Sequence, residues 1–91
     1  MGAHEDYIKS VISKLNLNDI ELLSAAVDSS GTNIFSISGG CNGNGNWKDY
    51  FLELSMLVAL LGERYNVWLI KLDNDTLDDV FYASFGFEEK E

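Results

Sequence analysis

Cysteine is almost absent from this chain of 91 residues, which contains only Cys41. A single cysteine excludes an internal disulfide, and it excludes the zinc sites that several cysteines build together. A reducing compartment suits a chain without disulfides, so we expect a cytoplasmic protein.

Long apolar runs are also missing. The densest run, residues 56–61, is far shorter than the ~20 residues that span a bilayer, and the N-terminus has no apolar signal segment. Met1 and Gly2 begin like a myristoylation motif, but Asp6 stands where that motif needs Ser or Thr. We therefore expect a soluble protein with no membrane partner.

Basic residues are scarce. Lys and Arg number 6 against 15 Asp and Glu, which gives a net charge of −9 and a pI near 4.3. Such a balance repels nucleic acid and anionic membranes, and it favours basic partners or cations. An acidic surface that serves solubility alone is the alternative interpretation.

The length fits one domain over residues 1–91. Hydrophobic residues make up 46% of the chain, which is enough to form a core and argues against disorder. The two ends, residues 1–3 and 88–91, are expected to fray. Oligomerisation could supply part of the stability of so small a domain.

Residues 47–61 carry the strongest pattern in the chain. Apolar side chains recur there at helical spacing, at Trp47, Tyr50, Phe51, Leu54, Leu57, Val58 and Leu61. Asn46 and Asp49 suit a capping box at the start, and Gly62 suits a left-handed stop. Residues 56–61 are apolar on every side, which predicts either burial beneath a sheet or a seam for a partner.

Two segments before this helix complete the first half of the fold. Residues 4–15 predict a short amphipathic helix. Residues 19–28 fit either a helix or a strand, and the turn signal Ser29-Ser30-Gly31 favours a hairpin. In that hairpin Phe35 and Ile37 share one face of the second strand.

The second half predicts another hairpin. Residues 67–72 predict a buried strand, which Asp73-Asn74-Asp75 break. Residues 79–87 predict a final strand with alternate apolar residues on one face, at Phe81, Ala83, Phe85 and Phe87. A helix capped by Thr76 and Asp79 is the alternative for this last segment.

The order of these elements predicts an α+β fold. It is a two-layer αββαββ sandwich with the long helix packed across an antiparallel sheet. This order, with the sequence VDSSG at the first hairpin, resembles the roadblock and profilin-like adaptor folds. The resemblance covers topology and no specific motif, and it implies a small dimeric adaptor.

The loop Gly39–Asn46 runs into a helix start, which is an arrangement that can cradle phosphate. It lacks a Walker motif, and Lys48 stands where a dinucleotide turn has its third glycine. Cys41 would need a base to act as a nucleophile, and nothing in the sequence places His4, the one histidine, beside it. We predict a plain mobile connection, so a ligand carrier or enzyme built on this loop is the least favoured function.

No catalytic set can be placed elsewhere in the chain. The sequence offers no Ser-His-Asp arrangement, metal-spaced histidine pair or glycosidase-like pair of carboxylates. We therefore predict a protein that is not an enzyme and that has no cofactor and no metal.

Acidic residues are densest over residues 73–91, which hold seven acids and one base. An EF-hand is excluded, because Leu77, Asp78 and Ser84 stand at its fifth, sixth and twelfth positions. An irregular calcium site stays open. The main interpretations are a charged edge that prevents aggregation and a patch that docks on a basic protein.

We predict from these features a non-enzymatic acidic protein-binding module. It would be an inhibitor of the immunity or phage anti-defence type that docks on a basic surface, such as one that binds nucleic acid, and mimics that acid. The expected binding residues are Trp47, Asp73, Asp75, Asp78, Asp79, Tyr82, Phe87, Glu88 and Glu89. The alternative is the dimeric adaptor, which would use residues 56–61 or an open sheet edge. Direct nucleic-acid binding is excluded, because the aromatics lie in a chain of the wrong charge.

Overall fold

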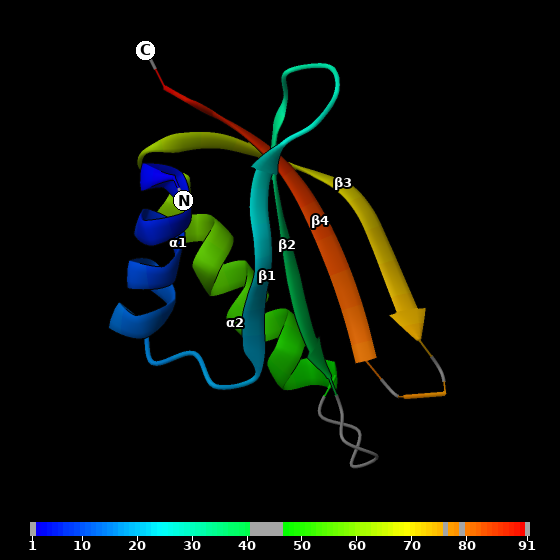
Figure 1. Cartoon of the computed structure of the whole chain (residues 1–91). Helices are drawn as coiled ribbons and strands as arrows, with labels where there is room; N and C mark the ends of the chain where they lie inside the picture. The colour runs from blue at the N-terminus through cyan, green and yellow to red at the C-terminus, as the bar shows by residue number, and fades with distance from the viewer. Residues whose placement is uncertain (1, 41–46, 76, 79, 91) are drawn as a thin grey trace.

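Two helices and four strands make up the described part of the chain. The computed structural model describes residues 2–40, 47–75, 77–78 and 80–90. Its elements are α1 (Ala3–Lys14), β1 (Ile20–Val27), β2 (Asn33–Gly40), α2 (Trp47–Leu61), β3 (Tyr65–Asp75) and β4 (Val80–Glu89). The strands form one antiparallel sheet in the order β1-β2-β4-β3, with both helices on the same face (Figure 1). The predicted two-layer αββαββ sandwich is confirmed.

The first hairpin confirms the strand interpretation of residues 19–28. In its turn, one carboxylate oxygen of Asp28 accepts hydrogen bonds from the backbone N–H groups of Ser30 and Thr32, each at 2.9 Å. Gly31 takes a positive φ of 88° in this turn. Hydrogen bonds hold the pKa of the Asp28 carboxyl below its usual value. The bond from the Ser30 hydroxyl has the largest effect, and the bonds from backbone N–H groups add to it. The turn chemistry therefore outweighs the helical pattern of the preceding segment.

The core lies between the helices and one face of the sheet. Phe35 and Ile37 share this face of β2, as predicted, and alternate residues of β4 join them. The last segment is therefore the predicted strand and not the capped helix. The buried apolar residues are Ile8, Val11, Leu17, Ile20, Phe35, Ile37, Tyr50, Leu54, Leu57, Leu61, Tyr65, Ala83, Phe85 and Phe87.

A close contact between Tyr50 and Gly39 seats α2 on the sheet. A Cβ atom added to Gly39 would collide with the Tyr50 ring and with the backbone carbonyl of Asp19. The Tyr50 hydroxyl donates a hydrogen bond of 3.3 Å to the carbonyl of Ile37, two residues earlier in β2. Gly39 and Gly40 thus end β2 and do not begin the predicted loop.

The end of α2 differs from the predicted left-handed stop. Gly62 does not take the positive φ that such a stop requires. Among the described glycines, a positive φ is found at Gly31. The N–H of Gly62 still donates to Val58 in the helical pattern, at 2.9 Å. The N–H of Glu63 then bonds to Leu60, three residues back, so the last turn tightens in the 3₁₀ manner. Asn46, the predicted cap at the other end, lies outside the described residues.

β3 is an exposed edge strand, which corrects the prediction of a buried strand over residues 67–72. It pairs with β4 on one side only, and the apolar side chains of Trp68, Leu69, Ile70 and Leu72 are about half exposed. The predicted break at residues 73–75 is also wrong. The ladder continues through Asp73 and Asp75, because β4 is long enough to pair with them.

The final residues of β4 continue the pairing with β3. Glu88 lies opposite Asn66 and Glu89 opposite Tyr65, and the N–H of Lys90 donates to the carbonyl of Arg64 at 3.1 Å. The structure thus includes residues 88 and 89 in β4, and the fraying expected for residues 88–91 stays a prediction.

The buried phenol of Tyr50 predicts a loss of stability at alkaline pH. Burial raises the pKa of Tyr50 to about 12, above its ordinary value of 10.0. Between these two values the unfolded chain gives up the phenol proton while the folded chain keeps it. The free energy of unfolding should therefore fall as pH rises from 10 towards 12, by at most about 1.4 kcal/mol per pH unit for this one proton.

Tyr50→Phe should flatten part of this alkaline decline. At neutral pH it should cost less than about 1 kcal/mol, because only one long hydrogen bond is lost. The measurement is urea denaturation at several pH values from 7 to 11.5. Tyr82→Phe, which removes a phenol from an exposed tyrosine, is the control variant. Identical slopes for wild type and Tyr50→Phe would contradict the assignment.

Candidate functional site

The β3–β4 hairpin ends in an acidic tip that carries one projecting leucine. We define the hairpin tip as Asp73, Asp75, Leu77, Asp78 and Tyr82. Leu77 is 95% exposed between two of the acids. One carboxylate oxygen of Asp75 accepts hydrogen bonds from the N–H groups of Leu77 and Asp78, at 3.0 and 3.3 Å. The turn therefore presents the leucine on a hydrogen-bonded frame.

The strands behind the tip hold its other side chains in place. Asp73 and Tyr82 lie opposite each other in the ladder, on the sheet face that the helices leave uncovered. Lys71 forms an ion pair of 3.1 Å with Asp73. Asp75 and Asp78 extend beyond this pair towards the turn, so the negative charge increases towards Leu77. Asp79 lies outside the described residues.

Trp47 reaches the same end of the molecule from the helix side. Its ring packs edge-on against Phe51 at 6.4 Å, and Phe51 packs against Phe81 at 5.2 Å. Phe81 pairs with Asn74 beside the tip. The Lys48 ammonium lies 5.6 Å from the centre of the Trp47 ring. One face of this half-exposed indole is thus already in contact with a cation of the same chain.

Three of the predicted binding residues lie elsewhere. Phe87 is 2% exposed and packs in the core, so it is not available as an exposed anchor. Glu88 and Glu89 end β4 at the far end of the sheet, six or more residues from Tyr82, which is about 20 Å or more along a strand. Glu89 lies 3.7 Å from Arg64. The acids that cluster in sequence are therefore divided between two ends of one hairpin.

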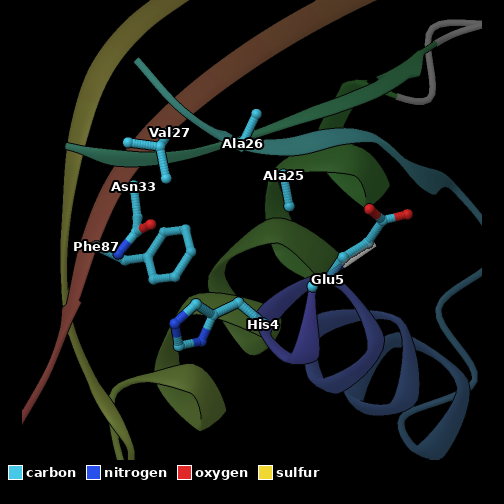
Figure 2. Close-up of a pocket in the computed structure, with 8 residues that line it drawn as sticks. His4, Glu5, Ala25, Ala26, Val27, Asn33 and Phe87 are labelled. Carbon is cyan, nitrogen blue, oxygen red and sulfur yellow. The ribbon is translucent and has the colours of Figure 1, made fainter. Parts of the chain in front are cut away.

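A small cavity lies between the start of α1 and the turn end of β1 and β2 (Figure 2). His4 and Glu5 border it on the helix side, and the side chains of Val27, Asn33 and Phe87 border it on the sheet side. Its volume is about 110 Å³, below the roughly 300–1,000 Å³ of ligand pockets, so it suits a few waters better than a metabolite.

His4 has a structural partner that the sequence did not reveal. Its Nδ1 atom forms a hydrogen bond of 2.8 Å with the hydroxyl of Tyr65, and its ring packs edge-on against Phe87. The guanidinium of Arg64 lies 4.4 Å from the centre of the Tyr7 ring nearby. Burial raises the pKa of Tyr65 above its ordinary value. No local pattern joins positions 4 and 65, so the sequence gives no sign of this contact.

The catalytic options of the glycine-rich stretch stay untested. Residues 41–46, which include Cys41, lie outside the described residues. His4 borders a cavity at Asn33, where β2 begins, whereas this stretch follows Gly40, where β2 ends. Seven residue steps along β2 separate the two ends by about 23 Å.

The described residues form neither a metal cluster nor a membrane-spanning helix. Among them, no three His, Cys, Asp or Glu side chains gather closely enough to hold a metal ion. None of the described helices has both the length and the apolar character needed to cross a membrane. No protein-family model, curated protein or solved structure matches the chain.

The uncovered sheet face carries a second aromatic–glycine contact. The indole of Trp68 lies on Gly86 of the neighbouring strand, where an added Cβ would collide with the ring. Beside this pair, the hydroxyls of Ser36 and Ser84 lie 3.1 Å apart across β2 and β4. Short side chains thus keep the middle of this face flat.

Gly86→Ala should displace the Trp68 ring. We expect a red shift of tryptophan emission and a loss of about 1 kcal/mol in stability, because the ring must leave a close-packed position. The spectrum is best recorded in a Trp47→Phe background, which leaves Trp68 as the one tryptophan. Ser84→Ala, on the same face of β4, is the control. Unchanged emission in Gly86→Ala would show that the indole does not rest on the glycine.

Proposed function

We propose that this protein is a non-enzymatic acidic binding module whose hairpin tip docks on a basic surface of another protein and blocks it. The observation that carries the proposal is Leu77, a large apolar side chain held almost fully in solvent between acids. In the free protein, the contact of this apolar side chain with water is unfavourable. Burial of the leucine in a pocket of a partner would therefore contribute favourable free energy to binding.

The charges at the tip specify the kind of pocket. Asp75 and Asp78 flank the leucine, and Asp73 and Tyr82 follow on the uncovered sheet face. A complementary surface therefore has an apolar pocket with basic residues at its rim. Acids at the rim of an interface steer the encounter, while the buried apolar residue supplies most of the affinity.

The net charge of the whole chain also favours a basic partner. Its net charge of −9 attracts a basic protein and repels other acidic ones. A partner whose basic surface normally binds a polyanion would be inhibited by occupation of that surface. The single cysteine suits action in the cytoplasm.

Leu77→Ser should weaken the complex roughly 10- to 100-fold, because burying a leucine is worth about 1.5–3 kcal/mol. The tagged wild-type protein is first used to capture partners from a host lysate at ~50 mM salt. The partner is then purified, and its Kd is measured for each variant. Leu23→Ser, at an exposed leucine in the middle of β1, is the matched control and should bind as the wild type does.

Charge is tested separately with Asp75→Asn/Asp78→Asn, which keeps an oxygen acceptor in the turn. We expect slower association and a weaker dependence of Kd on salt between ~50 and ~500 mM. Asp6→Asn/Glu63→Gln removes the same charge from exposed positions away from the tip. A neutral or acidic partner, or equal effects of the two double variants, would exclude tip docking.

A further inference from the structure

We propose that the basic partner of the hairpin tip also contacts the sheet face that the helices leave uncovered, where one of its arginine side chains stacks on the indole of Trp68. We call this face of the sheet the outer face. Glu88 on the neighbouring strand supplies the counter-charge. This second contact rests on the proposed function in one respect, namely that the partner is a basic protein.

Most bases of the chain lie on the helix side of the molecule. Lys9 and Lys14 belong to α1, and Lys48 belongs to α2. The guanidinium of Arg64 lies 4.4 Å from the centre of the Tyr7 ring, which also belongs to α1. Four of the six bases are therefore associated with the helices.

The outer face, in contrast, is acidic. Alternation along the strands places on it the residues that share a face with the paired Ser36 and Ser84. At the paired positions of the described strands, this face carries four acids and one base, namely Glu21, Lys71, Asp73, Asp75 and Glu88. The lysine is already engaged with Asp73 at 3.1 Å. Such a surface attracts cationic side chains and repels another copy of this acidic chain.

The indole of Trp68 is a flat platform on this acidic face. One side of the ring rests on Gly86, which has no side chain to hold it away. Trp68 is 43% exposed, so the opposite side of its ring is open to solvent. The cation–aromatic contacts among the described residues involve Tyr7, Trp47 and Tyr65, and none involves this indole. The open side of the ring is thus available to a cation of another molecule.

Glu88 stands beside the platform. In the ladder between β3 and β4, Trp68 lies opposite Gly86 and Asn66 lies opposite Glu88. Glu88 is therefore a diagonal neighbour of Trp68 on the same face, about 7–8 Å away. Its side chain is exposed. A cation that stacks on the indole can therefore also reach the carboxylate.

Arginine fits this arrangement better than lysine. The guanidinium group is planar and weakly hydrated, so it can stack on a flat ring while its N–H groups bond to a carboxylate. The ammonium group of lysine is compact and strongly hydrated, and it gains less from such a platform. Tryptophan is also the aromatic side chain that attracts cations most strongly.

The platform and the hairpin tip belong to one continuous surface. Tyr82 of the tip and Gly86 are four residues apart in β4, or about 13 Å along the strand. Ser84 lies between them on the same face and adds only a small side chain. An interface of ordinary size, ~800 Å² per partner, is wide enough to include both places. One partner can therefore cover Leu77 and Trp68 together.

Fluorescence titration with the peptide hexa-arginine tests the contact directly. Trp47→Phe leaves Trp68 as the one tryptophan, and Trp68→Phe leaves Trp47. The two indoles are similarly exposed, at 47% for Trp47 and 43% for Trp68, but Trp47 already contacts Lys48. At ~50 mM salt, the emission of Trp47→Phe should change saturably, with a Kd at least about 5-fold lower than for hexa-lysine. The emission of Trp68→Phe should change little.

Glu88→Gln in the Trp47→Phe background should raise the Kd for hexa-arginine about 2- to 5-fold, because one exposed ion pair is lost. Glu63→Gln, which removes an exposed acid next to the end of α2, is the matched control and should have a smaller effect. Equal responses of the two indoles, equal Kd values for the two peptides, or equal effects of the two substitutions would overturn the proposal.

Failure of the arginine contact and failure of tip docking give different results. Leu77→Ser should leave the hexa-arginine titration unchanged, whereas Trp68→Leu should weaken the complex with the purified partner about 2- to 30-fold. A partner Kd that responds to Leu77→Ser alone would overturn the arginine contact and leave tip docking in place. The opposite pattern would support the contact and exclude tip docking. Should Trp68→Leu fail to fold, Glu88→Gln replaces it in this comparison.

Discussion

The contact of Tyr50 with Gly39 determines where the helix layer lies. A side chain at position 39 would push the ring away, so α2 can pack this closely only over a glycine of β2. From this position α2 packs on Ile37 of β2 and, through the Tyr50 and Phe51 rings, on Phe81 of β4, and α1 lies on the β1 side. Two helices of this size do not also cover the fourth strand. The exposure of the apolar side chains of β3 is therefore a consequence of one helix–sheet contact.

The elements of the fold could be predicted from the sequence, because their signals are local. Helical spacing in residues 47–61 and alternation in β4 each fall within one segment. The turn after β1 could also be predicted, since the acceptor Asp28, its donors and Gly31 are neighbours in sequence. The edge position of β3 could not be predicted, because the sequence VWLIKL is as apolar as that of a central strand. Only the order of strands, which depends on contacts between distant segments, shows that it is an edge.

The candidate site shows the same limit. Seven acids close together in sequence suggested one patch, but a hairpin carries the two ends of such a segment in opposite directions. Asp75 stays at the tip while Glu89 lies beside Arg64 at the far end. Leu77 carried a signal that sequence reasoning passed over, namely an apolar residue alone among turn-forming acids. Its exposure makes it the most informative residue of the tip.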